Sequence, residues 1–281
     1  MTYQQTPVAE QDACRYRAQM PKHTDSYLLR TGRYLWRVPF LLWHVLVNLP
    51  LVLLTITLPV RRIKIRAMRL EYRAINWWSR WLMRVFGIRV RSVGTPLPGA
   101  TLFVANHVSW VDIVVLHSQR MMGFVAKREI ASWPLVGWMA SKAETIFHQR
   151  GSQESLGDVL ALMSERLKTG YSVGAFPEGG TRNGRELGPF HARIFTAAVE
   201  AAVPVQPVAL RYGRDGTAQT QVAFAPRENF LQNFLRLLGN PMIDADVIFL
   251  EPILPGSTEA EGRRRIAETA RARIAAVLPA S

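Results

Sequence analysis

A histidine and an aspartate five positions apart are the first side chains in this sequence that could move a proton. His107 and Asp112 belong to the segment Asn106–Asp112, which directly follows the apolar stretch Thr101–Ala105. An imidazole accepts a proton near neutral pH, and a carboxylate within reach can orient the ring and stabilise its protonated form. If a helix begins near Ser109, Asp112 lies in its first turn and can point back at His107. The alternative is a surface histidine and a helix-start acid that never meet.

A glycine-rich segment, Phe176–Gly184, could bind an anion. It continues from an apolar stretch and contains Pro177 and three glycines. These residues predict a tight turn whose backbone amides could face an anion, and Arg182 adds a fork of donors. The alternative is a plain glycine-rich turn without a ligand.

Two more cations follow apolar stretches. Lys127 comes after Gly123–Ala126, and Arg150 ends the segment Thr145–Arg150. Each alone is typical of a solvated surface. Because the carboxyl ends of parallel strands meet at one edge of a sheet, we expect a basic pocket with one acid–base pair, suited to an alcohol that carries a phosphate. That pocket gathers His107, Lys127, Arg150 and the segment from Glu178 to Arg182. No P-loop, dinucleotide fingerprint or zinc-ligand spacing occurs, so no metal is expected.

The elements that position these residues alternate between strand and helix. Apolar periodicity and helix-end signals place helices between several apolar strands. This alternation predicts an α/β fold with a mixed, mostly parallel sheet that is flanked by helices. The predicted strands are Thr101–Ala105, Gly123–Ala126, Thr145–Phe147, Tyr171–Phe176, Val205–Leu210, Gln221–Ala225 and Asp246–Leu250. The predicted helices are Ser152–Leu167, His191–Ala202, Glu228–Leu238 and Thr258–Val277.

The composition limits the class of protein and of partner. The 281 residues are 48% hydrophobic, and Cys14 is the only cysteine. These values exclude a disordered chain and a disulfide-rich scaffold. Lys and Arg total 35 against 21 Asp and Glu, a formal net charge of +14. Such an excess needs an anionic partner, which could be nucleic acid, an anionic membrane surface or a phosphorylated substrate.

The apolar stretch Val38–Val60 predicts a membrane-binding segment. It contains no Asp, Glu, Lys or Arg, and as a helix it would rise about 34 Å, enough to cross a bilayer. Pro50 interrupts it, and both flanks are basic, which favours entry and exit on the same face. We therefore predict an N-terminal membrane-embedded helical hairpin that is broken near Pro50. The alternatives are one full span and a buried pair of helices in a soluble domain.

A helix with two different stripes follows this stretch. Arginines at helical spacing mark one face, and apolar residues that include Trp77 and Trp81 mark another. This pattern is typical of a helix lying on an anionic lipid surface, although a solvated face over an ordinary core face would also give it. The predicted organisation is a polar arm over 1–34, a membrane-binding helical module over 35–90 and an α/β domain over 91–281. The arginines are Arg62, Arg66, Arg69, Arg73, Arg80 and Arg84.

Four blocks in order resemble the glycerolipid acyltransferase family, specifically the 1-acylglycerol-3-phosphate (lysophosphatidic acid) acyltransferases. Asn106–Asp112 resembles the N-H-x4-D block of that family, and Thr145–Arg150 resembles its second block, which ends in arginine. Phe176–Arg182 looks like its F-P-E-G block, and Val203–Ala209 looks like its V-P-V-x-P-V block. The resemblance covers roughly residues 70–255.

The resemblance implies a membrane-bound enzyme of phospholipid synthesis. The enzyme would move a fatty acyl group from acyl-CoA or acyl carrier protein, as a co-substrate, to the sn-2 hydroxyl of lysophosphatidic acid. His107 would be the general base and Asp112 would orient it, without a bound cofactor. The site would lie on the cytoplasmic face of the inner (cytoplasmic) membrane. The residues that the resemblance implies for substrate binding are Lys127, Arg150, Glu178, Gly179, Thr181 and Arg182.

Three other interpretations remain at this point. The same chemistry could act on a lyso-ornithine lipid or on another lysophospholipid. The chain could also be a non-catalytic membrane-associated protein on an acyltransferase-like scaffold, although the intact His107 and Asp112 pair argues against this. Binding to nucleic acid is suggested by charge alone. This interpretation is disfavoured because the arginine stripe lies beside an apolar stretch that is long enough to cross a bilayer. No nucleic-acid partner is therefore expected.

Overall fold

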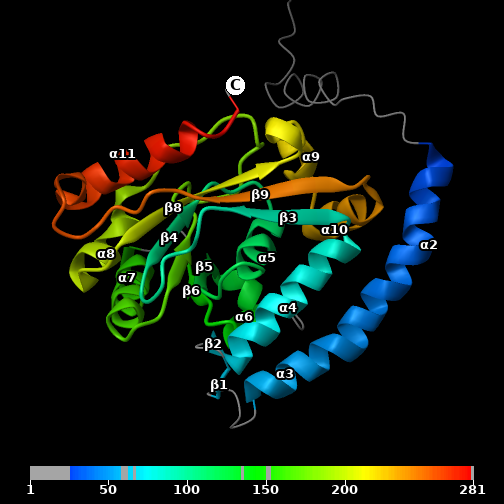
Figure 1. Ribbon diagram of the computed structural model, residues 1–281, viewed down its shortest axis with the longest axis horizontal. Coiled ribbons are helices and arrows are strands. Elements are labelled where there is room, and N and C mark those ends of the chain that lie inside the picture. The colour runs from blue at the N-terminus through cyan, green and yellow to red at the C-terminus, as the bar shows by residue number, and fades with distance from the viewer. Residues whose placement is uncertain (1–25, 58–62, 66–67, 134–135, 150–152, 280–281) are drawn as a thin grey trace, which may run out of the picture.

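In the computed structural model, seven strands form the central sheet (Figure 1). They are β3 (Ile88–Val93), β4 (Leu102–Ala105), β5 (Gly123–Lys127), β6 (Ile146–His148), β7 (Val173–Ala175), β8 (Val205–Tyr212) and β9 (Ile243–Phe249). Their order is β3-β9-β8-β4-β7-β5-β6, and every neighbouring pair is parallel except β8 and β9. The predicted mixed, mostly parallel sheet is therefore confirmed. The structure describes residues 26–57, 63–65, 68–133, 136–149 and 153–279.

Two layers of helices cover the sheet, because alternate residues of a strand point to opposite faces. On β4, Phe103 and Ala105 join the core of one layer, and Leu102 and Val104 join the core of the other. The first layer contains α4 (Leu70–Val85), α5 (Val111–His117) and α10 (Phe230–Gly239). The second contains α7 (Gln153–Lys168), α8 (Thr196–Ala201) and α11 (Gly262–Ala275). Figure 1 shows the two layers on either side of the strands.

Six predicted strands are confirmed and one is wrong. Each of β4 to β9 overlaps a predicted strand, but Gln221–Ala225 contains the end of a short helix, α9 (Gln219–Val222), and a loop. The reason is the guanidinium of Arg236, which donates to the carbonyls of Gln221 at 2.5 Å and Ala223 at 2.7 Å. Carbonyls that bind a side chain are not available to a strand ladder.

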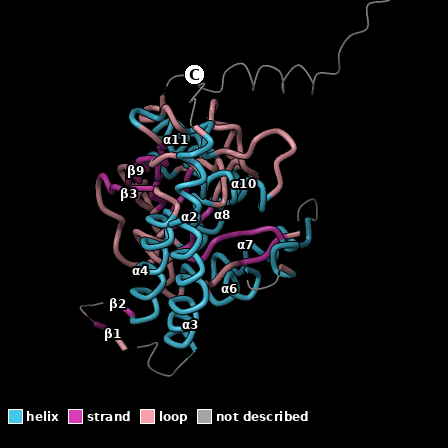
Figure 2. Tube along the Cα trace, turned by 90° about the vertical axis from the view of Figure 1, so that its right-hand side faces the viewer, coloured by secondary structure: helices cyan, strands magenta, loops and turns pink. Residues whose placement is uncertain are grey.

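The amino-terminal apolar stretch forms one continuous helix. It runs through α2 (Tyr27–Trp43), a π-helical turn (His44–Asn48) and α3 (Leu49–Thr57). The break predicted at Pro50 is therefore wrong. In the π turn the amide of Leu49 bonds to the carbonyl of His44, five residues back, and this wider turn gives room to the proline ring that follows. Figures 1 and 2 show α4 returning beside this helix, so the pair of helices here is 27–57 with 70–85 and not the predicted hairpin folded at Pro50.

Most of this helix is not covered by the rest of the chain. It is long and apolar enough to cross a membrane, and only 22% of its most apolar window is buried. Trp77 and Trp81 of α4 are also exposed, each at 44%, whereas Val85 of the same predicted apolar stripe is buried in the core. Arg62 and Arg66 of the arginine stripe lie outside the described residues, as does the segment 1–25 of the predicted polar arm. Exposed apolar side chains include Leu35, Phe40, Trp43, Leu46, Leu51 and Leu54.

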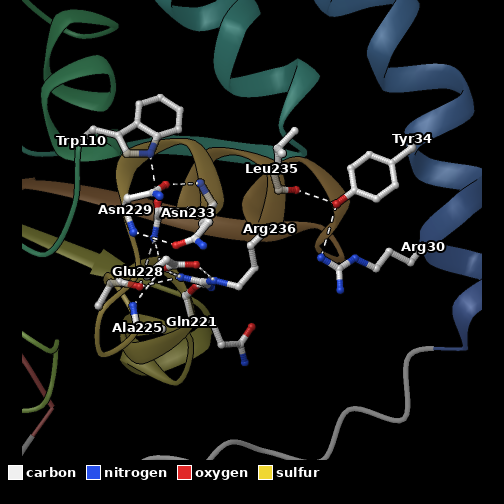
Figure 3. Close-up of polar contacts among 12 residues, drawn as sticks. Arg30, Tyr34, Trp110, Gln221, Ala225, Glu228, Asn229, Asn233, Leu235 and Arg236 are labelled. Carbon is white, nitrogen blue, oxygen red and sulfur yellow. Dashed lines mark hydrogen bonds and ion pairs between the residues drawn. The ribbon is translucent and has the colours of Figure 1, made fainter.

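Polar side chains of α2 hold the carboxyl-terminal end of α10. The last carbonyls of a helix have no partner within it and form the negative end of its dipole. The Tyr34 hydroxyl donates to the carbonyl of Leu235 at 2.7 Å (Figure 3). The buried Arg37 donates to the carbonyls of Leu238 and Asn240, both at 2.8 Å. These contacts dock α2 on the α/β domain while its apolar residues face outward.

A second polar network involves Asn233 and Arg236 of α10 (Figure 3). The fully buried Asn233 accepts a hydrogen bond from the indole N–H of Trp110 at 3.0 Å and donates to Glu228 at 2.8 Å. Arg236 forms two hydrogen bonds with the Glu228 carboxylate, at 2.6 and 2.8 Å. Because Trp110 lies between His107 and Asp112 in the sequence, this network connects α10 to the candidate acid–base segment.

Replacing Glu228 by glutamine is expected to lower the free energy of unfolding by about 2 kcal/mol at neutral pH, because charge-assisted hydrogen bonds are lost. Burial opposes ionisation of Glu228, but hydrogen bonds from Arg236, Ala225 and Asn233 outweigh it and lower its pKa. The stabilisation is therefore present above the pKa of an unfolded glutamate, about 4.3, and is lost as the pH falls through the lower folded pKa. Denaturant unfolding across this range measures it. The control Glu165→Gln, on the exposed face of α7, should change the free energy of unfolding by under about 0.5 kcal/mol. A difference between wild type and Glu228→Gln that stayed constant with pH would contradict this explanation.

Candidate active site

The end of β4 is fixed to its neighbour β8 by one side chain. The Asn106 amide oxygen accepts from the backbone N–H of Leu210 at 2.8 Å, and its nitrogen donates to the carbonyl of the same residue at 3.0 Å. The Asn106 amide thus takes the place of a backbone partner beyond the last ladder pair, Ala105 and Val208. The chain can then leave the sheet, and His107 is the first residue of the turn.

The predicted meeting of His107 and Asp112 is present. The Nδ1 atom of His107 lies 2.7 Å from Oδ2 of Asp112, whose side chain is completely buried. The same oxygen accepts the backbone N–H groups of Val108 and Ser109, at 2.7 and 2.9 Å. Asp112 lies in the first turn of α5, as predicted. Its carboxylate binds backbone N–H groups of the turn that precedes this helix.

This geometry determines how the histidine is presented. An ionised carboxyl only accepts hydrogen bonds, so Nδ1 of His107 carries the proton and Nε2 keeps a free lone pair. The ring stacks on Phe176 with centroids 3.9 Å apart and planes 12° from parallel. Phe176 in turn stacks on Phe124. The 14% exposure of the His107 side chain leaves the ring accessible at one edge.

Tyr212 is a site residue that the sequence did not indicate. Its hydroxyl donates to Oδ1 of Asp112 at 2.6 Å, from the end of β8 and one hundred positions along the chain. Burial, and then the negative charge of Asp112, raise the pKa of Tyr212 well above its ordinary value. The phenol therefore stays protonated and remains a donor. With Tyr212, the carboxylate of Asp112 has donors on both oxygens.

Replacing Tyr212 by phenylalanine is expected to lower kcat about tenfold. This factor corresponds to the free energy of one hydrogen bond to a charged group, which the variant loses. The Michaelis constants should stay within about twofold, because Tyr212 contacts Asp112 and not the substrates. Steady-state kinetics would separate these constants. Tyr171→Phe removes a hydroxyl that lies 3.4 Å from Arg69, away from the site, and serves as the control. A rise in a Michaelis constant without a change in kcat would contradict the positioning role of Tyr212.

Glu178 holds the glycine-rich turn against the histidine turn. Its Oε1 accepts the backbone N–H of His107 at 2.9 Å, and its Oε2 accepts that of Gly188 at 2.8 Å. The backbone N–H of Arg182 donates to the carbonyl of His107 at 2.7 Å. Burial raises the pKa of Glu178, and the two backbone donors and Arg182 oppose this effect. Both oxygens of Glu178 are thus occupied by donors of the protein itself.

The structure places the other predicted site residues differently. Gly179 has a φ of +73°, which a side chain rarely adopts, and an added Cβ would lie 3.1 Å from the ring of His191. Thr181 and Arg182 are exposed, with Nε of Arg182 lying 3.5 Å from Glu178. Lys127 ends β5 with an exposed side chain. Arg150 lies outside the described residues. The described part of the chain contains no group of three or more His, Cys, Asp or Glu that could hold a metal ion.

Comparison with known proteins identifies this arrangement. A family model described as Acyltransferase matches residues 71–211, a range that includes His107, Asp112 and the turn at Glu178. The chain belongs to the acyltransferase family. The resemblance predicted from the four blocks is therefore confirmed, and this acyltransferase is an enzyme of the family.

Relatives of the acyltransferase carry two names. It is similar to a lyso-ornithine lipid O-acyltransferase of Pseudomonas aeruginosa, with 40% identity over 63% of this chain and 68% of the relative. It is also similar to a 1-acyl-sn-glycerol-3-phosphate acyltransferase of Neisseria gonorrhoeae, with 39% identity over 45% of this chain and 49% of the relative. The crystal structure of the 1-acyl-sn-glycerophosphate (LPA) acyltransferase PlsC from Thermotoga maritima superposes with a TM-score of 0.64. The superposition covers 88% of this chain and 96% of that chain at 21% identity, which shows a shared fold.

Proposed function

We propose that this acyltransferase moves a fatty acyl group from a thioester to the hydroxyl of a membrane lysolipid, with His107 as the general base. The observation that carries the proposal is the contact of 2.7 Å between His107 and Asp112, which leaves Nε2 of the ring as a proton acceptor. An alcohol is a poor nucleophile until a base removes its proton during attack. A paired imidazole at the end of a central strand is suited to that step.

The reaction needs no covalent enzyme intermediate. Nε2 of His107 takes the hydroxyl proton as the alcohol oxygen forms a bond to the thioester carbonyl carbon. The carbon–sulfur bond then breaks, and the departing thiolate takes the proton back from His107, so the products are an ester and a free thiol. Asp112 stabilises the imidazolium between these steps. No resident cofactor is required, because the acyl donor, acyl-CoA or acyl carrier protein, is a co-substrate.

Lysophosphatidic acid is the first candidate acceptor, acylated at its sn-2 hydroxyl to give phosphatidic acid. Its phosphate suits the exposed Arg182, whose backbone binds the His107 turn, and we assign the same role to Lys127, which ends β5, and to Arg150. Gly179 and Thr181 shape the turn beside the acceptor, and Glu178 positions it. Lyso-ornithine lipid is the second candidate, favoured by the names of the relatives from Pseudomonas aeruginosa and Brucella abortus.

The exposed apolar helix, Tyr27–Thr57, is assigned to the membrane. The helix and the tryptophans of α4 hold the site against the leaflet, so the lipid acceptor reaches His107 without leaving the bilayer. We place the enzyme at the inner (cytoplasmic) membrane with the site on the cytoplasmic face, where acyl thioesters are available. This assignment rests on the low burial of the helix and on its length.

A competition assay tests the acceptor. The purified full chain in mixed micelles receives a labelled acyl thioester with equal amounts of lysophosphatidic acid and lyso-ornithine lipid, and the labelled products are separated. Labelled phosphatidic acid as the dominant product supports the first candidate. Dominant labelled ornithine lipid replaces it with the second. Equal thioester consumption by wild type and His107→Ala, with every acceptor, would instead favour a non-catalytic protein.

A further inference from the structure

A cavity of about 880 Å³ lies between α11 and the segment that follows the glycine-rich turn. Its charged lining residues are Arg182, Arg264, Arg271, Glu186 and Glu268. Arg271 donates to the carbonyls of the neighbouring Leu187 and Gly188, at 2.8 and 2.9 Å, and so fixes the wall of the cavity. Arg264 also lines this cavity and is exposed, and no side-chain hydrogen bond or ion pair of Arg264 is found among the described residues.

A second cavity, of about 330 Å³, shares Arg182, Glu186, Leu187 and Arg271 with the first. Its lining also includes residues on either side of the candidate base, Asn106 and Val108, together with Glu178. The backbone of Arg182 is itself hydrogen-bonded to His107. The two cavities therefore form a series that extends from α11 to the turn that carries the base.

The position of these cavities relates them to one of the two substrates. In the second layer of helices, Ile266 and Ala270 of α11 pack with α7 and α8 on one face of the sheet. The exposed apolar helix docks on α10, which belongs to the layer on the opposite face. Figure 1 shows α11 on the left and α2 on the right of the sheet. A lipid acceptor arrives on the α2 side, which leaves the α11 side to a water-soluble donor.

We propose that the larger cavity binds the phosphate-bearing end of the phosphopantetheine group of the acyl donor, with Arg264 as its guanidinium ligand. This inference rests on the proposed function, because it assigns a site to the donor of that reaction. The planar guanidinium pairs with two phosphate oxygens at once, and the volume is within the range of small-molecule sites. Phosphopantetheine is shared by acyl-CoA and acyl carrier protein, and the second cavity extends from the first to Asn106 and Val108, the neighbours of His107 in its turn.

A pair of adjacent arginines provides the test. Arg264→Ser removes the cavity guanidinium, whereas Arg265→Ser removes the same charge from the next position of α11, which is exposed and does not line the cavity. Coenzyme A and a holo acyl carrier protein are each titrated against the full-length variants in detergent, with pantetheine as the ligand without phosphate. We expect Arg264→Ser to weaken binding of a phosphorylated ligand about tenfold. Arg265→Ser should weaken it less than about twofold.

The outcomes identify the ligand. Whichever ligand loses affinity through Arg264→Ser, coenzyme A or the carrier protein, is assigned as the source of the phosphopantetheine. Equal affinities of wild type and Arg264→Ser for both ligands overturn the proposal. Equal weakening of binding by Arg264→Ser and Arg265→Ser also overturns the proposal, because it would indicate diffuse surface charge. An increase only in the Michaelis constant of the acceptor overturns it as well. A binding loss specific to Arg264→Ser in a protein without acyl transfer would refute the proposed function and leave this site standing.

Discussion

Replacing His107 by alanine is expected to lower kcat by about 10²–10⁴, the usual contribution of a positioned general base. Among the described residues, only His107 has a ring nitrogen in contact with the Asp112 carboxylate. The variant therefore lacks the group that would accept the hydroxyl proton. The alcohol would then have to attack while still carrying its proton. Turnover of an acyl thioester in mixed micelles, measured with saturating acceptor, gives the change in kcat.

A second histidine supplies the control for this variant. His148 ends β6 at the same edge of the sheet, but its Nδ1 atom contacts the Ser155 hydroxyl at 3.0 Å and not a carboxylate. His148→Ala should keep kcat within about threefold of wild type, and both variants should unfold cooperatively. If His107→Ala kept more than about a tenth of wild-type kcat, His107 would not be the base.

Replacing Asp112 by asparagine is expected to lower kcat by a similar factor, about 10²–10⁴. The amide oxygen can still accept the backbone N–H groups of Val108 and Ser109 and the ring N–H of His107, because all three point at one position. The amide carries no negative charge, however, so it no longer stabilises the imidazolium that forms during attack. The substrate-contacting surfaces are unchanged, so both Michaelis constants should change little.

A double variant tests whether Asp112 acts through His107. In the His107→Ala background the histidine is absent, so adding Asp112→Asn should lower kcat by less than about threefold. Independent effects would instead multiply to the product of the two single losses. Multiplying effects would show that the carboxylate contributes to catalysis by another route.

The acid–base pair could be predicted because its two members are close in sequence. A strand end followed by a helix start brings His107 and the first-turn Asp112 together through local geometry alone. Tyr212 completes the same site from one hundred positions away, through the pairing of β8 with β4. A tyrosine at the end of a strand is ordinary in sequence, and only the register of the sheet shows that it reaches Asp112.

Two errors in the fold come from long-range contacts, and a third has a local cause. Gln221–Ala225 alternates like a strand, but Arg236 of a later helix binds its carbonyls. The strand β3 was not predicted, because Arg89 and Arg91 resemble a continuation of the basic helix until Asp244 of β9 is seen to pair with both. At Pro50 the ring alone predicts a break, and the compensating π turn comes from the preceding residues.

Glu178 shows a further limit of reading residues one at a time. The resemblance assigned it to substrate binding, but its two oxygens accept backbone N–H groups of His107 and Gly188. These contacts give Glu178 a structural part in joining two turns, and its predicted part in substrate binding stays a prediction. A carboxylate that binds backbone and one that binds a ligand look the same in a sequence.

The contacts that α2 and Trp110 both make with α10 have a consequence for how the enzyme can be dissected. The helix Tyr27–Thr57 is not a separate appendage, because its Tyr34 and Arg37 donate to carbonyls of α10, and the same helix accepts the indole N–H of Trp110 in the loop of His107. A truncation that removes Tyr27–Thr57 therefore also removes hydrogen bonds from the helix that supports this loop. We expect such a truncated chain to lose activity in detergent as well as in membranes.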